Sequence, residues 1–100
     1  MAYKVVISDE AKIDLKEHYL YYKKVASKKV ADGFFNDFDS TRKAVAKSPY
    51  FRIWFDNFRA VPLKKYPFII FYLISSDNII LIARIFHTSQ NPEKYPISKV

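Results

Sequence analysis

The sequence predicts an α+β fold in the order β-α-α-β-β-β, with two N-terminal helices packed on one face of a mainly antiparallel sheet. Three observations lead to this prediction. The chain opens with a short alternating segment, continues with two amphipathic segments of helical period, and carries two nearly apolar runs in its second half. One hundred residues, half of them apolar, suit one core, so we expect a single domain over residues 1–100.

The first strand and the first helix follow directly from the N-terminal residues. Residues 3–7 alternate and are rich in β-branched side chains, which predicts a short strand. Ser8 is a suitable N-cap, and apolar side chains then recur at spacings of three and four residues. The helix that they form should end near Val25.

The second helix is predicted to be more strongly amphipathic than the first. Ser27 is its expected N-cap, and Pro49 stops it. Gly33, the only glycine of the chain, lies within this helical pattern. A glycine there costs about 1 kcal/mol relative to alanine unless close packing requires it.

The second half of the chain changes to the period of strands. Residues 58–63 predict a strand whose proline indicates an edge or a bulge, and residues 64–67 form a turn. Two apolar runs, 68–74 and 79–86, predict a central hairpin with a four-residue loop. The polar tail from residue 88 onwards should wrap the surface.

The register of this hairpin decides which side chains share a face. Pairing of Ile74 with Ile79 would put Arg84 on one face with Ile69 and Phe71. His87 would then lie on the opposite face and would not converge with Arg84 unless a bulge intervened. The residues expected beside His87 are Tyr72, Leu81 and Ala83.

The composition excludes several classes of function. The absence of cysteine excludes disulfide frameworks, cysteine–zinc sites and thiol nucleophiles. A single glycine excludes a phosphate-binding glycine loop, and two distant histidines support no metal site, so we expect neither metal nor cofactor. No apolar run approaches the roughly 18–20 residues that span a bilayer, and no signal-peptide pattern is present, so we expect a cytoplasmic protein without membrane contact.

The net charge of +7 is unevenly distributed along the chain. Residues 1–39 hold seven lysines and seven acidic residues, whereas residues 40–100 hold ten basic residues and three acidic ones. All of the excess positive charge therefore lies in the second part. Such a field favours an acidic partner, either nucleic acid or an acidic polypeptide.

Three stretches of the sequence, in their order and spacing, resemble a known family. Residues 59–72 read RAVPLKKYPFIIFY, with an arginine, a Tyr-Pro pair and an apolar strand that ends in tyrosine. Residues 85–92 read IFHTSQNP, a strand end followed by His-x-x-x-x-Pro, and residues 7–22 give a similar opening strand and helix. Over nearly its whole length the chain resembles the RelE/ParE toxin superfamily, and its ParE-like members more closely.

The resemblance implies the toxin of a bacterial type II toxin–antitoxin system, of the kind also described as plasmid stabilization systems. Its partner would be a short acidic antitoxin that folds onto the basic face, in a toxin–antitoxin hetero-oligomer. One branch of the superfamily poisons DNA gyrase, and the other is an mRNA interferase that cleaves mRNA in the ribosome. A detoxified relative would act only as a binding module with its antitoxin.

Metal-free RNA cleavage needs an acid or base near neutral pH and fixed cations. If the chain is such an endoribonuclease, the resemblance assigns catalysis to Arg59, His87 and Tyr95. Other positions depart from that branch: Ile69 and Gln90 stand where it has arginines, and Ala60 and Pro62 where it has lysines. These departures favour the gyrase-directed branch.

The expected target- or antitoxin-binding residues each have a structural alternative. Arg84 either pairs with a carboxylate on the second helix, Asp37 or Asp39, or faces an open groove. Arg59 either binds a partner or clamps the tail, and the aromatic residues 50–58 either stack on bases or anchor the core or a loop. The full expected binding set is Arg59, Lys64, Lys65, Arg84 and His87.

Overall fold

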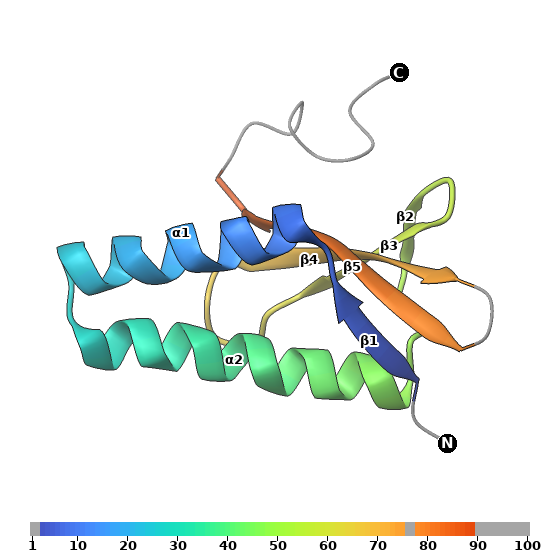
Figure 1. Cartoon of the computed structure of the whole chain (residues 1–100), viewed down its shortest axis with the longest axis horizontal. Coiled ribbons are helices and arrows are strands. Elements are labelled where there is room, and N and C mark those ends of the chain that lie inside the picture. Colours follow the sequence, from blue (N-terminus) through green and yellow to red (C-terminus); the bar gives the residue numbers. More distant parts are fainter. Residues whose placement is uncertain (1–2, 76–77, 90–100) are drawn as a thin grey trace.

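The computed structural model describes residues 3–75 and 78–89. In that part, the elements are β1 (Lys4–Ile7), α1 (Asp9–Val25), α2 (Lys28–Lys47), β2 (Ile53–Phe55), β3 (Phe58–Pro62), β4 (Phe68–Ser75) and β5 (Ile79–His87). The sheet has the order β1-β5-β4-β3-β2; β1 runs parallel to β5, and the other neighbours are antiparallel (Figure 1). The predicted class is confirmed, although the sequence does not predict β2. β2 has only three residues, and its pairing with β3 shifts in register, so its sequence is too short to show the alternation that predicts a strand.

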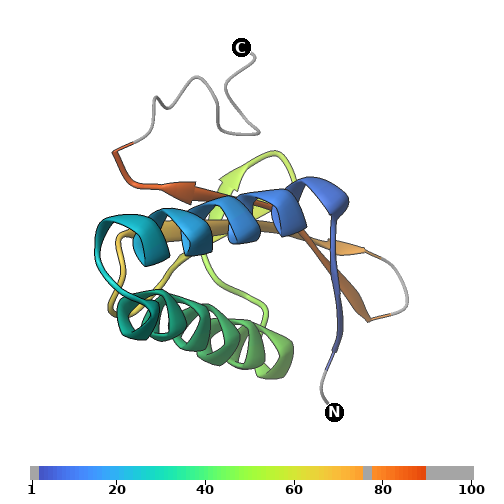
Figure 2. The ribbon, with the colours of Figure 1, turned by 60° about the vertical axis from the view of Figure 1, so that its left-hand side comes forward.

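Both helices begin and end where the sequence predicts. The Ser8 and Ser27 hydroxyls each accept a hydrogen bond from the backbone N–H three residues later, at 3.0 and 3.1 Å. α2 ends at Lys47, shortly before Pro49. The two helices form an antiparallel hairpin that lies against the sheet (Figures 1 and 2). Within the described residues, no helix is both long enough and apolar enough to cross a membrane.

The main core lies between the helices and the sheet, and a smaller cluster lies on the opposite face. In the smaller cluster Phe71 and Phe86 are buried, with Ala60 and Ile69 packed against them. Both faces of the central strands are thus covered, which explains why their sequences are apolar runs rather than alternating patterns. The main core includes Phe34, Phe38, Val45, Phe68, Ile70, Tyr72, Ile80, Ile82 and Ile85.

The register of the β4–β5 hairpin differs by one residue from the prediction. Ile74 pairs with Ile80, and Ser75 pairs with Ile79, so Ser75 belongs to the strand and not to the loop. Leu81 consequently lies opposite Leu73, and its predicted place beside Tyr72 and His87 is wrong.

A bulge in β5 then shifts the later pairs by one more residue, to two residues from the predicted register, so their partners differ from the prediction while Arg84 and His87 keep their predicted faces. Phe71 pairs with Arg84 and Tyr72 with Ile82, which leaves Ala83 as the extra residue. Directly opposite residues share a face, so Arg84 lies with Phe71, and His87 lies with Phe68 on the helix side. The bulge lies before Arg84 and not between Arg84 and His87. Regular alternation from residue 84 to residue 87 therefore keeps these two side chains on opposite faces.

Pro62 lies on the open side of β3. Leu63 donates its backbone N–H to Phe68 on β4, whereas Ala60 donates to Arg52 on the other side. Backbone N–H groups point to alternate sides along a strand, so the backbone nitrogen of residue 62 points to the same side as that of Ala60. β2 pairs with β3 only as far as Arg59, so β2 does not reach position 62. The proline therefore removes no hydrogen bond from the sheet. β3 itself lies between β4 and β2, so the predicted edge applies to its end at Pro62 and not to the whole strand.

Close packing explains the glycine in α2. A Cβ atom on Gly33 would lie 3.4 Å from Cζ of Tyr66 and closer still to its hydroxyl. That hydroxyl donates a hydrogen bond of 2.8 Å to the Val30 carbonyl in the same helix. Gly33 thus admits the tyrosine that joins the β3–β4 turn to α2.

We expect Gly33→Ala to stabilise the protein by about 1 kcal/mol when Tyr66 is first changed to phenylalanine, because the gain in helix propensity then meets no steric opposition. With Tyr66 intact the gain should shrink or reverse, since the hydroxyl must move. Urea unfolding of the four proteins in this double-mutant cycle measures the difference. An equal effect in both backgrounds would contradict the packing explanation.

Candidate functional site

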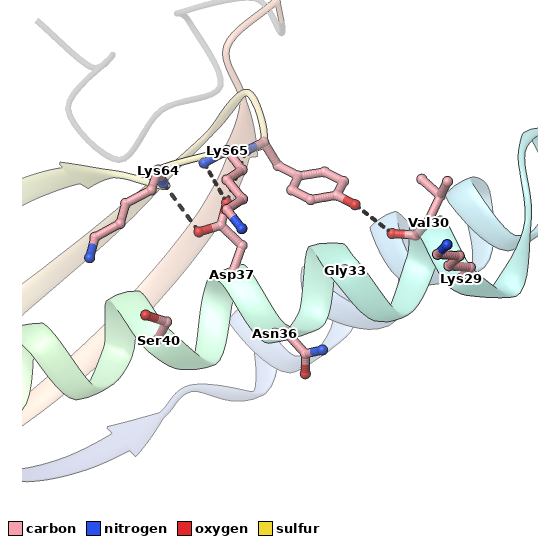
Figure 3. A pocket seen from close by; sticks show the side chains of 9 residues that line it. Lys29, Val30, Gly33, Asn36, Asp37, Ser40, Lys64 and Lys65 are labelled. Carbon is pink, nitrogen blue, oxygen red and sulfur yellow. Dashed lines mark hydrogen bonds between the residues drawn. The ribbon is translucent and has the colours of Figure 1, made fainter.

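A basic groove lies between α2 and the turn that joins β3 to β4. It is a hollow of about 660 Å³, and Figure 3 shows the side chains that line it. Lys64 and Lys65 come from the turn, and Lys29 comes from the first turn of α2. The remaining lining residues are Val30, Gly33, Asn36, Asp37, Ser40 and Tyr66.

The carboxylate of Asp37 holds the turn in place. It accepts backbone hydrogen bonds from Lys64 at 3.2 Å, Lys65 at 2.7 Å and Tyr66 at 2.9 Å, two of which Figure 3 shows as dashed lines. Three successive N–H groups converge on one buried side chain, which fixes the backbone while the lysine side chains stay exposed. The groove therefore presents cations on a fixed frame and suits an anionic or acidic ligand.

Arg84 is held by α1, and the prediction that it pairs with Asp37 or Asp39 on α2 is wrong. Its guanidinium donates to both carboxylate oxygens of Asp14, at 2.8 and 3.0 Å, and lies over the ring of Phe86. The hydrogen bond to Asp14 raises the pKa of Arg84 above its usual value. The prediction fails because α1 is the helix beside Arg84 on β5, whereas Asp37 of α2 faces the β3–β4 turn.

The polar side chains of α1 cover the edge of β5 beyond the end of β1. Ser8 donates to the Ala83 carbonyl at 2.8 Å, and Asp14 accepts from the Ile85 N–H at 3.0 Å. Nε2 of His18 lies 3.1 Å from the Ile85 carbonyl oxygen. Burial lowers the pKa of His18, which favours the neutral ring. These bonds satisfy backbone groups that an open edge would expose.

The predicted ribonuclease residues do not form one cluster in the described part of the chain. Arg59 pairs with Tyr72 and His87 pairs with Phe68, four residues apart on β4, which corresponds to roughly 13 Å along the strand. The guanidinium of Arg59 donates to the Phe51 carbonyl at 2.7 Å. Tyr95 lies outside the described residues, as do the predicted tail contacts of Arg59.

Asp14 and Asp37 organise the fold around the site, although neither was predicted to do so from the sequence. Each stands within the apolar stripe of its helix, beside Ala11 in α1 and beside Phe34 and Phe38 in α2. An acidic residue in a core-facing position needs a partner. That position in the stripe is the signal that could have found them.

A family model supplies the identification. It is described as the ParE toxin of the type II toxin–antitoxin system parDE, and it matches residues 5–92. The chain belongs to this ParE toxin family. The match spans every element of the fold except the first residue of β1, so the predicted superfamily and its ParE-like branch are confirmed.

Solved structures of toxin–antitoxin systems share the fold. A chain from a chromosomal ParDE toxin–antitoxin system of P. aeruginosa superposes with a TM-score of 0.76 at 18% identity, over 86% of this chain and 96% of that one. A chain from the RelBE2 toxin–antitoxin complex of Mycobacterium tuberculosis gives 0.60 at 12% identity, over 87% and 99%. No curated protein sequence matches significantly.

We expect Asp37→Ala to lower the free energy of unfolding by about 2–4 kcal/mol, because three backbone N–H groups of the β3–β4 turn lose their acceptor. Asp39→Ala is the matched control. Among the described residues Asp39 bonds only to Arg42 and Lys43 on the surface of the same helix, and its loss should cost less than about 1 kcal/mol. Urea unfolding distinguishes them, and equal losses would contradict the role given to Asp37.

Proposed function

We propose that this ParE-family chain arrests growth by acting on DNA gyrase in the bacterial cytoplasm, and that it binds the target without cutting a covalent bond itself. Its antitoxin, encoded beside it, would be the second partner. The family membership supports the toxin role, and the gyrase target rests on the arrangement of the basic residues.

The observation that carries this proposal is that Arg59 and Arg84, the two arginines of the binding set expected from the sequence, are engaged in structural bonds. Arg59 fixes the Phe51 carbonyl, and Arg84 is bound by the buried carboxylate of Asp14. A ribonuclease needs such cations turned towards a phosphorane-like transition state. Lys64 and Lys65, in contrast, are exposed beside the groove and are available for a macromolecular partner.

The antitoxin should place an acidic segment in the basic groove. Lys29, Lys64 and Lys65 supply the complementary charge, and the Asp37 bonds fix the backbone before the partner arrives. A preformed frame reduces the ordering cost of binding, which favours a short segment that folds on the toxin. The result would be a toxin–antitoxin hetero-oligomer.

Purified protein should block DNA supercoiling by gyrase and trap cleaved DNA, measured on agarose gels with relaxed and supercoiled plasmid. Induction without antitoxin should arrest growth while transcripts stay intact. Gyrase that remains active in a large excess of the protein would refute the proposal. Normal growth on induction would indicate a detoxified binding module.

The paired substitution Lys64→Glu and Lys65→Glu tests the antitoxin groove within the same experiment. The variant should no longer be rescued by co-expressed antitoxin, because the charge of the groove is reversed. Lys12→Glu with Lys16→Glu on the exposed surface of α1 is the matched control and should still be rescued. Rescue of both variants would exclude the groove as the antitoxin site.

A second candidate function is the ribosome-dependent mRNA endonuclease, which one pocket favours. A cavity of about 280 Å³ is lined by two histidines, His18 and His87, together with Tyr21, Tyr22, Phe68 and Ser89. Two imidazoles in one pocket offer the acid and base that metal-free RNA cleavage requires.

The endonuclease predicts cuts within codons of translated messages only, seen by mapping transcript 5′ ends after brief induction. The double variant His87→Ala, Tyr95→Phe should then lose both the cuts and the toxicity. Toxicity equal to that of the unmodified protein would remove this candidate and leave the gyrase proposal standing.

A further inference from the structure

An exposed apolar surface follows the end of α2. We call it the aromatic edge, and it consists of Tyr50, Phe51, Ile53 and Trp54, which are 67%, 37%, 53% and 43% exposed. Ile53 and Trp54 belong to β2, the edge strand of the sheet (Figure 1). Tyr50 and Ile53 thus expose more than half of their surface, whereas Phe51 and Trp54 are partly covered, so the anchoring alternative holds in part and leaves exposed rings beside it.

Several contacts orient the rings of the aromatic edge. The hydroxyl of Tyr50 lies 2.7 Å from that of Tyr3, and the guanidinium of Arg59 lies 5.3 Å from the Tyr50 ring centroid. Trp54 packs edge-on against Phe71, with 6.2 Å between ring centroids. Rings fixed in this way lose little conformational freedom when a flat ligand stacks on them.

The charge around the aromatic edge is basic. Lys47 precedes it, Arg52 lies within it, and both are exposed. Neither forms an ion pair with any residue in the parts of the chain that the structure describes. Between residues 47 and 59 the only acidic residue is Asp56. A second copy of this chain would therefore meet like charge here, whereas a polyanion would be attracted.

Aromatic side chains next to free cations match the chemistry of single-stranded nucleic acid. Unpaired bases stack on aromatic rings, and Lys and Arg contact the phosphates. A duplex hides the faces of its bases, and an acidic peptide offers few flat groups to stack. We propose that the aromatic edge is a binding surface for single-stranded nucleic acid, which passes around the sheet at β2 and pairs its phosphates with Lys47 and Arg52. It stacks on Tyr50, which lies with Arg59 on the helix side, and on Trp54, which lies with Phe71 on the opposite face.

This surface is independent of the gyrase proposal. Gyrase holds DNA and a translating ribosome holds mRNA, so a strand of either kind is within reach of a toxin bound to one of them. Separate DNA and RNA oligonucleotides distinguish the two sources.

Trp54 is the only tryptophan of the chain and reports directly on this surface. We expect its fluorescence to be quenched saturably by oligothymidylate or oligouridylate of about 12 nucleotides at low salt. The affinity should fall as salt rises, because phosphate contacts release counterions. The better ligand of the two identifies DNA or RNA as the source.

Two pairs of variants test the assignment of residues. Tyr50→Ala should weaken binding by about 5- to 100-fold through lost stacking. Arg52→Ala should reduce the slope of log affinity against log salt by about 0.7, the value for one phosphate contact. The matched controls are Tyr21→Ala, an aromatic residue that is 62% exposed on α1, and Lys16→Ala on the same helix. Both should bind as the unmodified protein does.

Three outcomes would overturn the proposal. The first is an absence of quenching by both oligonucleotides at low salt. The second is an equal loss of affinity in the α1 controls and in the variants of the aromatic edge. The third is quenching by a polyglutamate peptide without quenching by either oligonucleotide, which would assign the surface to an acidic polypeptide. Arg52 is exposed and forms no ion pair within the described residues, so its variant keeps the test valid if Tyr50→Ala fails to fold.

Discussion

The buried carboxylate of Asp37 is the interaction on which the candidate site depends. By accepting three successive backbone N–H groups, it joins the middle of α2 to the turn between β3 and β4. The position of the turn sets the position of Lys64 and Lys65, and it brings Tyr66 against the helix at Gly33. A groove with lysines on both sides exists because one acidic side chain, buried in the interface, organises the backbone that carries them.

Asp14 plays the same part for α1 on the same face of the sheet, at β5 instead of the β3–β4 turn. It accepts the Ile85 N–H and binds the guanidinium of Arg84, so that the helix covers β5 where β1 has ended. An arginine in an apolar strand is costly without a partner, and here a half-buried arginine meets a buried carboxylate. Arg84 therefore stabilises the joint between α1 and the sheet, whereas the groove lysines form no ion pair with any described residue.

The positive charge of the second part of the chain serves two separate surfaces in this interpretation. The groove has a fixed frame and few apolar residues beyond Val30, which suits an acidic segment of a protein partner. The aromatic edge combines exposed rings with Arg52, which suits stacked bases. A toxin that must be released from an antitoxin and then engage a target benefits from surfaces that do not overlap, because binding at one leaves the other accessible.

The sequence by itself determined the α+β class, both helices with their serine caps, and the membership of the superfamily. These features depend on local periodicity, capping chemistry and the order of short motifs, all of which can be read from neighbouring residues in the sequence. It did not determine the hairpin register, because Ser75 pairs with Ile79 and shortens the loop, and a bulge at Ala83 shifts the later pairs by one more residue with no local marker. The carboxylate that Arg84 meets, the exposure of Tyr50 to Trp54 and the three N–H groups bound by Asp37 were likewise decided by the tertiary structure. The bonds of Asp14 and Asp37 join residues that are distant in sequence, and the exposure of residues 50 to 54 depends on which element covers them. Only the packing of the helices on the sheet determines these contacts and this exposure.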